Sequence, residues 1–129
     1  MSDKTARDIT AEAKQAVPTL SLTEAKHKYD QGAIFLDVRE VFEWWGGRVQ
    51  NAVHIPRGLL EWRAANRLPN KARPIVAYCA SGARSALAAA RLQEMGYHDV
   101  SSMNAGYKAW RKAGYPVERT LLSYLLGGW

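Results

Sequence analysis

Residues 78–85 place the one cysteine of the chain among residue types that can hold an anion. Cys79 is predicted to end a buried strand, and Gly82 allows the backbone after it to turn tightly. Consecutive N–H groups in such a loop can point inward and form a nest for negative charge. The helix expected next adds free N–H groups and the positive end of its dipole, and Arg84 adds a full charge. A thiol in that field is expected to have a lowered pKa and to react as a thiolate.

A purely structural cysteine is the alternative to a nucleophile, because isolated cysteines are mostly small buried hydrophobic residues. The position of Cys79, at a strand end and before a glycine, an arginine and a helix start, favours the nucleophile. Ser81 fits a turn position, and Ser85 fits the N-cap of the following helix. The candidate site is therefore Cys79 together with its loop, which comprises Ala80, Ser81, Gly82, Ala83, Arg84 and Ser85.

Charged residues follow a second predicted strand. Asp37 and Arg39 lie two residues apart at its end, and we interpret them as an ion pair that fixes the geometry beside the site. Arg57 is a candidate for steering a charged substrate, whereas His54, next to Ile-Pro, is assigned to packing. No group of His, Cys, Asp and Glu has the spacing of metal ligands, so no metal is expected.

Short apolar runs alternate with segments of helical spacing along the chain. Strands are predicted over 33–38, 74–79 and 100–103, with a short extended piece over 53–56. Helices are predicted from a Ser21–Glu24 capping box to Gln31, and over 41–45, 59–66, 85–95 and 107–113. This alternation predicts an α/β fold with a mostly parallel central sheet flanked by helices. Ligands of such sheets bind beyond the carboxyl ends of the strands, which is where Asp37 and Cys79 are expected.

The composition is that of one soluble domain. The chain has 129 residues, of which 47% are hydrophobic and 23% charged. No apolar run approaches the roughly 18 residues needed to span a bilayer. The N-terminus lacks the apolar core of a secretory signal, so we expect a cytoplasmic protein. The net charge of +6 favours anionic partners, but the basic residues are scattered, so no nucleic-acid partner is expected.

Several segments, in this order, resemble the rhodanese-homology domains. Cys-Ala-Ser-Gly-Ala-Arg-Ser at 79–85 resembles their active-site loop, in which a cysteine takes up sulfane sulfur. Leu-Asp-Val-Arg-Glu at 36–40 resembles their strand-end motif, and His-Ile-Pro at 54–56 resembles their next landmark. The segments at 105–110 and 114–117 resemble their C-terminal signature. The combination is more specific than any one of these pieces.

The resemblance implies a single rhodanese-like domain over residues 19–118. Residues 1–18 form an N-terminal extension with a short helix expected over 10–17, and residues 119–129 form an apolar tail. The tail is expected to fold back on the domain or to join a second copy in a homodimer. The chain departs from the family at 47–51, where Gly-Arg-Val-Gln-Asn replaces a frequent Gly-His-Ile-Pro-Gly stretch, so no family role is carried over to His54.

The resemblance also implies a reaction that needs no cofactor. A sulfurtransferase of this kind takes sulfur from a small anionic donor such as thiosulfate onto Cys79 as a persulfide, and passes it to cyanide or a thiol. A cysteine-dependent phosphatase is the weaker alternative, because its loop has one residue more than the four that separate Cys79 from Arg84. A rhodanese-like module that binds a partner without catalysis is another alternative, and the intact loop argues against it.

Overall fold

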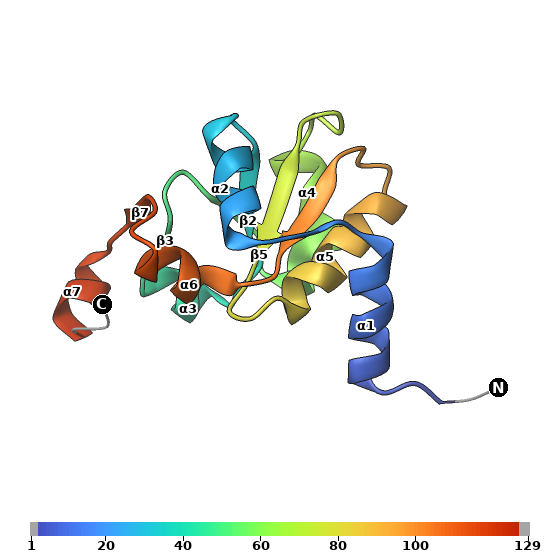
Figure 1. The fold of residues 1–129 in the computed structure, drawn as a ribbon, viewed down its shortest axis with the longest axis horizontal. Coiled ribbons are helices and arrows are strands. Elements are labelled where there is room, and N and C mark those ends of the chain that lie inside the picture. The colour runs from blue at the N-terminus through green and yellow to red at the C-terminus, as the bar shows by residue number, and fades with distance from the viewer. Residues whose placement is uncertain (1–2, 127–129) are drawn as a thin grey trace.

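The computed structural model describes residues 3–126 and has a parallel β-sheet at its centre (Figure 1). Its five strands follow the order β1-β6-β5-β2-β4, and each neighbouring pair is parallel. The strands are β1 (Thr19–Leu20), β2 (Ile34–Asp37), β4 (Val53–His54), β5 (Ile75–Tyr78) and β6 (Val100–Met103). The predicted α/β fold with a central parallel sheet is confirmed.

Helices cover both faces of this sheet (Figure 1). They are α1 (Ala6–Ala16), α2 (Leu22–Asp30), α3 (Val41–Trp45), α4 (Leu60–Arg67) after the 3-10 turn η1 (Arg57–Leu59), α5 (Ala83–Glu94), α6 (Gly106–Lys112) and α7 (Leu121–Leu126). Among residues 3–126, no helix has both the length and the apolar character needed to cross a membrane.

The side chains of β5 show how the two faces are filled. Ile75 belongs to a core cluster with residues of α4 and α5, whereas Val76 and Tyr78 belong to a second cluster with residues of α2 and α6. Successive side chains of a strand point to opposite faces, so a strand covered on both faces is apolar throughout. This arrangement explains the uninterrupted apolar run that precedes Cys79 in the sequence.

The N-terminal helix is longer than the predicted 10–17. It begins at Ala6 because Thr5 and Asp8 form a capping box, in which Asp8 N–H donates to Thr5 Oγ1 at 3.1 Å and Thr5 N–H donates to Asp8 Oδ2 at 3.0 Å. Helix α1 packs along α5, where Ala13 and Val17 are buried (Figure 1). The extension therefore contributes to the core and supports the helix that begins at the cysteine loop.

A small second sheet was not predicted from the sequence. Its strands β3 (Arg48–Val49) and β7 (Val117–Glu118) are antiparallel, and Arg48 Nε lies 3.1 Å from Glu118 Oε2. Two-residue strands are too short to show an alternating pattern, so they could not be predicted from the sequence. The pairing fixes the chain just before α7.

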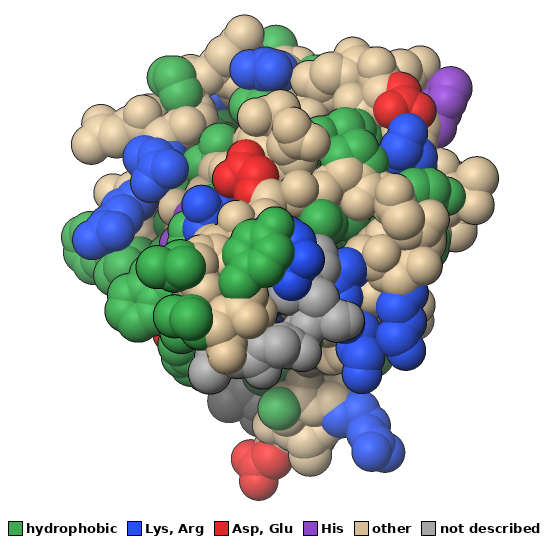
Figure 2. Space-filling view, turned by 90° about the vertical axis from the view of Figure 1, so that its left-hand side faces the viewer, with side chains coloured by type: hydrophobic (Ala, Val, Ile, Leu, Met, Phe, Trp, Pro, Cys, Tyr) green, Lys and Arg blue, Asp and Glu red, His purple; other side chains and the backbone are tan. Residues whose placement is uncertain are grey.

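The apolar tail is helical at its start. Thr120 directly precedes α7 and its Oγ1 donates to the carbonyl oxygen of Trp45, which ties the helix to the end of α3. Leu121 and Leu125 nevertheless remain 74% and 73% exposed, so these leucines do not fold back on the domain. They contribute to the hydrophobic side chains that gather at this end of the molecule (Figure 2). Residues 127–129 of the predicted tail lie outside the described residues, and the tail-mediated homodimer stays a prediction.

Candidate active site

Cys79 directly follows β5, at the carboxyl end of the sheet. The next residues turn into α5, whose N-cap is Gly82 with a φ of +96°. A side chain at this position would be strained, and its Cβ would lie 2.8 Å from the carbonyl oxygen of Asn104. The expectation that Ser85 caps this helix was wrong, because the left-handed glycine starts the helix earlier and Ser85 lies within its first turn.

The sulfur of Cys79 receives hydrogen bonds from the loop that follows it. Gly82 N–H donates to Sγ at 3.1 Å and Ser85 N–H donates to Sγ at 3.4 Å. The hydroxyl of Ser85 lies 3.5 Å from Sγ and 2.8 Å from the hydroxyl of Ser102 on β6. Ser85 therefore serves the sulfur rather than the helix end, and Ser102 orients it from the sheet. The loop forms a cradle, which we define as residues 79–85.

These contacts determine the protonation of the thiol. Burial, the largest effect, raises the pKa of Cys79, since it disfavours the charged form. The Ser85 hydroxyl and the backbone N–H groups of Ser85, Ser81 and Gly82 favour the thiolate, and together they outweigh the burial. The net result is a pKa of Cys79 below its ordinary value, in the direction that the loop sequence predicts.

Replacing Ser85 by alanine is expected to raise the pKa of Cys79, because the hydroxyl is the largest of the groups that favour the thiolate. The pH at which iodoacetamide alkylation is half-maximal will then move upward, since only the thiolate reacts. Ser101→Ala is the matched control. Ser101 is buried on β6 like Ser102, but its side chain points to the opposite face of the sheet. An equal pH profile for the wild type and Ser85→Ala would contradict the assignment.

The first residues of helix α6 pack against the backbone of the cradle. Tyr107 N–H donates to the carbonyl oxygen of Cys79 at 2.9 Å. Gly106 has a φ of +82°, and a Cβ on it would lie 2.0 Å from the carbonyl oxygen of Ala80. The backbones therefore touch at a point where no side chain fits. The sequence indicated Gly106 as part of a family signature, but its contact with the loop is visible only in the fold.

Arg84 does not stand free beside the cysteine. Its Nη1 lies 2.7 Å from Glu43 Oε1 and its Nη2 lies 3.0 Å from Glu43 Oε2, which makes a bidentate ion pair with α3. The hydrogen bonds from Arg84 lower the pKa of Glu43 more than burial raises it. Sequence reasoning missed Glu43, since nothing in the sequence pairs it with a residue on α5.

Asp37 and Arg39 form the ion pair that the sequence predicts, and it is closed off from solvent. Asp37 is 0% exposed and Arg39 is 5% exposed, and Arg39 Nη2 lies 2.7 Å from Asp37 Oδ2. The hydroxyl of Tyr78 donates to the same oxygen at 2.6 Å, and Arg39 Nη2 donates to the carbonyl oxygen of Gly47 at 2.8 Å. Burial and the neighbouring Asp37 raise the pKa of Tyr78 well above its ordinary value, so Tyr78 stays a hydrogen-bond donor. The cluster fixes the residue that precedes Cys79.

Replacing Asp37 by asparagine is expected to lower the free energy of unfolding by about 3 kcal/mol, because it leaves the buried Arg39 without its counter-charge. Urea denaturation at neutral pH measures the loss. Asp30→Asn is the matched control: Asp30 pairs with Lys26 at 2.7 Å on the surface of α2, and losing that pair costs less than about 1 kcal/mol. Equal losses in the two variants would contradict the assigned role of the buried pair.

Two further candidates lie elsewhere. Arg57 pairs with Glu61 at 3.0 Å and lines a pocket between α1 and α5, so its role in steering a substrate stays a prediction. His54 stacks on Trp44 with ring centroids 4.6 Å apart, and its Nε2 lies 2.8 Å from the carbonyl oxygen of Arg39. That geometry agrees with the packing role predicted for His54.

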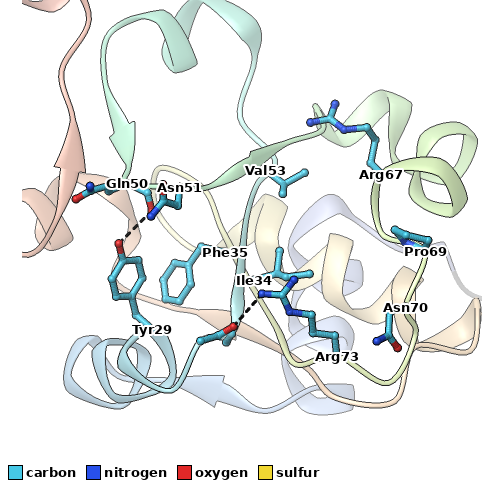
Figure 3. Close-up of a pocket in the computed structure, with 12 residues that line it drawn as sticks. Tyr29, Ile34, Phe35, Gln50, Asn51, Val53, Arg67, Pro69, Asn70 and Arg73 are labelled. Atoms are coloured by element: carbon cyan, nitrogen blue, oxygen red, sulfur yellow. Dashed lines mark hydrogen bonds between the residues drawn. The ribbon is translucent and has the colours of Figure 1, made fainter.

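A pocket of 490 Å³ lies at the amino ends of the strands rather than at the cradle (Figure 3). Ile34 and Phe35 of β2 line it, together with Arg73, which donates to the carbonyl oxygen of Gly32 at 3.3 Å. No cradle residue lines this pocket. The chemistry at Cys79 is therefore separate from it.

The family model of the rhodanese-like domain matches residues 21–113, which include the cradle, the Asp37–Arg39 pair and Gly106. The chain belongs to the rhodanese family. The match covers most of the predicted domain, and it agrees with the resemblance of the loop and strand-end motifs.

Similar proteins include named sulfurtransferases. This rhodanese is 34% identical over 87 residues to a sulfurtransferase of Allochromatium vinosum, with 67% of this chain and 79% of that protein covered. It is 35% identical to the putative sulfur carrier protein YrkF of Bacillus subtilis, where the match covers 78% of this chain and 55% of that protein. The chain thus spans about half of the Bacillus protein.

A solved structure shares almost the whole fold. A Rhodopseudomonas palustris protein, described as of unknown function and a possible tyrosine phosphatase, has a TM-score of 0.81 and 29% identity to this rhodanese. The match covers 92% of this chain and 97% of that one. The same fold is therefore associated with two proposed reactions, sulfur transfer and phosphate hydrolysis. The geometry of the cysteine loop has to distinguish these two reactions.

Proposed function

We propose that this rhodanese is a sulfurtransferase in which Cys79 carries sulfane sulfur as a persulfide. The observation that carries the proposal is the pair of hydrogen bonds that the backbone N–H groups of Gly82 and Ser85 donate to Sγ, at the end of β5. N–H donors fixed around a sulfur stabilise the negative charge of a thiolate, and they stabilise a terminal persulfide sulfur in the same way. The sulfurtransferase of Allochromatium vinosum among the relatives supports the same reaction.

The cycle has two displacement steps at sulfur. The Cys79 thiolate attacks the outer sulfur of a donor such as thiosulfate, the S–S bond of the donor breaks, and sulfite leaves with the bonding electron pair. Cyanide or a thiol then attacks the outer sulfur of the Cys79 persulfide, and the Cys79 thiolate is released. Sulfur moves between nucleophiles in both steps, so the balance requires no electron carrier and no cofactor.

The remaining loop residues position the sulfur. Ala80 and Ser81 form the turn with Gly82, and Ala83 begins α5. Arg84 and Ser85 provide charge and hydrogen bonds in the first turn of that helix. The Asp37–Arg39 pair stabilises the carboxyl ends of β2 and β5, since Asp37 ends β2 and accepts a hydrogen bond from Tyr78 of β5. In this proposal Cys79 alone forms a covalent bond with the substrate.

The phosphatase alternative is weaker because of the size of the loop. A ring with four residues between Cys79 and Arg84 suits one sulfur atom better than a phosphoryl group with three oxygens. Arg84 is also occupied by both carboxylate oxygens of Glu43, which compete with phosphate for its donors. A binding module without catalysis would not need several donors around its cysteine.

The proposed setting is the cytoplasm, because the cycle needs a reduced thiol and Cys79 is free. The partners are a small sulfur donor and a thiol acceptor. A second copy of the chain is a further proposed partner, since exposed leucines of α7 offer an apolar contact.

Intact-protein mass spectrometry tests the proposed function. After incubation with thiosulfate or with glutathione persulfide, the protein is expected to gain one sulfur, about 32 Da, and to lose it on addition of cyanide. Hydrolysis of p-nitrophenyl phosphate, measured on the same sample, tests the alternative. Phosphate release without any gain of sulfur from either donor would overturn the proposal in favour of a phosphatase.

A further inference from the structure

The charge of Arg84 is compensated before any substrate arrives. Arg84 lies in the first turn of α5, close enough to Cys79 for the thiolate to favour its charged form. Glu43 takes one hydrogen bond from each terminal nitrogen of Arg84, at 2.7 and 3.0 Å. The side chains of Arg84 and Glu43 are 33% and 21% exposed, so the pair is partly shielded from water. A donor at the cradle therefore meets an ion pair, not a lone cation.

Glu43 is held in this position by a second contact. Its Oε1 accepts a hydrogen bond from the N–H of Glu40 at 3.0 Å, which closes the capping box at the start of α3. A carboxylate that caps its own helix does not need Arg84 to stay in place. The carboxylate that neutralises Arg84 is therefore held in place by α3 itself. A substrate has to compete with this preorganised carboxylate for the guanidinium.

Possible sulfur donors differ in the charge they bring. Thiosulfate is a dianion, so its reaction with the Cys79 thiolate gathers three negative charges at the cradle. A thiol persulfide with an uncharged R group, in its protonated form R–S–SH, reacts as Cys79–S⁻ + R–S–SH → Cys79–S–SH + R–S⁻, with a single negative charge throughout. In this step the donor S–S bond breaks, a new S–S bond forms at Cys79, and the thiolate R–S⁻ leaves with the electron pair. Because Glu43 already neutralises Arg84, the site favours the thiol persulfide over the dianion thiosulfate.

Apolar side chains surround the same helix. Val41, Phe42 and Trp45 of α3 are 44%, 66% and 52% exposed. Hydrophobic side chains gather at this end of the molecule, where α3 and α7 meet (Figure 2). Thiosulfate has no apolar part to use such a surface, whereas the R group of a persulfide does.

We propose that the Glu43–Arg84 pair makes this rhodanese selective for thiol persulfides over thiosulfate. The inference rests on the proposed function and names its donor class. Glu43 acts through Arg84, so it is a positioning residue that sets specificity. The persulfide can be carried by a small thiol or by a peptide cysteine, and the two sources differ in how much of the α3 surface they contact.

The test compares kcat/KM for two donors, thiosulfate and the persulfide of 2-mercaptoethanol, whose R group is uncharged, with cyanide as acceptor. The wild type is expected to prefer the persulfide of 2-mercaptoethanol by at least about tenfold. Glu43→Gln keeps the shape and the capping oxygen but removes the charge. It is expected to raise kcat/KM for thiosulfate about tenfold and to leave the value for the persulfide of 2-mercaptoethanol nearly unchanged, because the uncompensated charge of Arg84 acts mainly on the dianion. Added salt will reduce the gain.

Glu40→Gln is the matched control. It removes an equal charge at the N-cap of the same helix, where Glu40 raises the pKa of Arg84 through its charge and less than Glu43 does, so a smaller gain in kcat/KM for thiosulfate is expected. The double variant Glu43→Gln with Arg84→Gln restores a neutral pair, and it is expected to bring the ratio of the two donors back to the wild-type value. Thermal melts of each variant establish that it is folded before its kinetics are compared.

The two sources of persulfide are separated at Phe42. Phe42→Ser is expected to leave kcat/KM for the persulfide of 2-mercaptoethanol unchanged and to lower it for a persulfidated Leu-Cys-Leu peptide if peptides use the α3 surface. Equal values for both probes would assign the donor to small thiols.

Selectivity for thiosulfate in the wild type, or a Glu43→Gln effect of equal size on both donors, would overturn the inference while leaving the sulfurtransferase intact. Absence of transfer from either donor would instead overturn the proposed function itself. The experiment thus separates the two failures.

Discussion

Cys79→Ser is expected to abolish sulfur transfer, with thiocyanate formation from donor and cyanide falling at least about a thousandfold. A serine hydroxyl keeps nearly the same shape but is not ionised near neutrality and cannot carry sulfane sulfur. The chain has no other cysteine to take over the reaction. Colorimetric thiocyanate measurement and intact mass, taken on the same preparation, report the turnover and the sulfur carried.

The control for this variant is Ser101→Ala, which alters a buried residue on β6 and is expected to turn over like the wild type. Circular dichroism of Cys79→Ser establishes that the fold is retained, as expected for a change of one atom. Transfer by Cys79→Ser at a rate near that of the wild type would place the reacting sulfur elsewhere and refute the persulfide at Cys79.

Gly106→Ala is expected to have the second largest effect, because the added Cβ would lie 2.0 Å from the carbonyl oxygen of Ala80. The backbone at Gly106 also has a φ of +82°, which side chains rarely adopt. Either α6 or the cradle must move, and we expect a loss of unfolding free energy on the order of 3 kcal/mol or more. Urea denaturation measures this loss, and sulfur loading at Cys79 is expected to fall with it.

Gly114→Ala separates the contact from the backbone strain. Gly114 has a φ of +80°, almost equal to that of Gly106, but nothing lies within 4 Å of its Cβ position. Its replacement therefore carries the conformational penalty alone, about 1 kcal/mol. If the two alanine variants lose equal stability and load equal sulfur, the close approach of α6 to the cradle has no role.

The features that sequence reasoning found are local ones. Cys79, Gly82 and the helix after them occupy one short segment, and the residue types in that segment are enough to predict a turn with inward N–H groups. The Ser21 capping box is equally local, and its bonds to Glu24 are present at 2.8 and 3.1 Å. A contact between near neighbours leaves a pattern in the sequence, so it can be predicted.

The features that sequence reasoning missed join distant segments. Tyr78 and Asp37 are 41 residues apart, as are Arg84 and Glu43. A tyrosine in a buried strand or a glutamate in a short helix has many plausible partners, and only the sheet order selects one. Ser85 was assigned to the helix end for a related reason, since the sequence does not show that Gly82 adopts a positive φ.

The lone cysteine has a consequence for how long the sulfur stays on the protein. With no second thiol in the chain, no neighbouring side chain can displace the persulfide by forming an internal disulfide. Discharge must wait for a collision with a molecule from outside, so its rate will be first order in acceptor. At low acceptor concentration the loaded form will accumulate, and the protein will behave as a sulfur store whose lifetime is set by its surroundings.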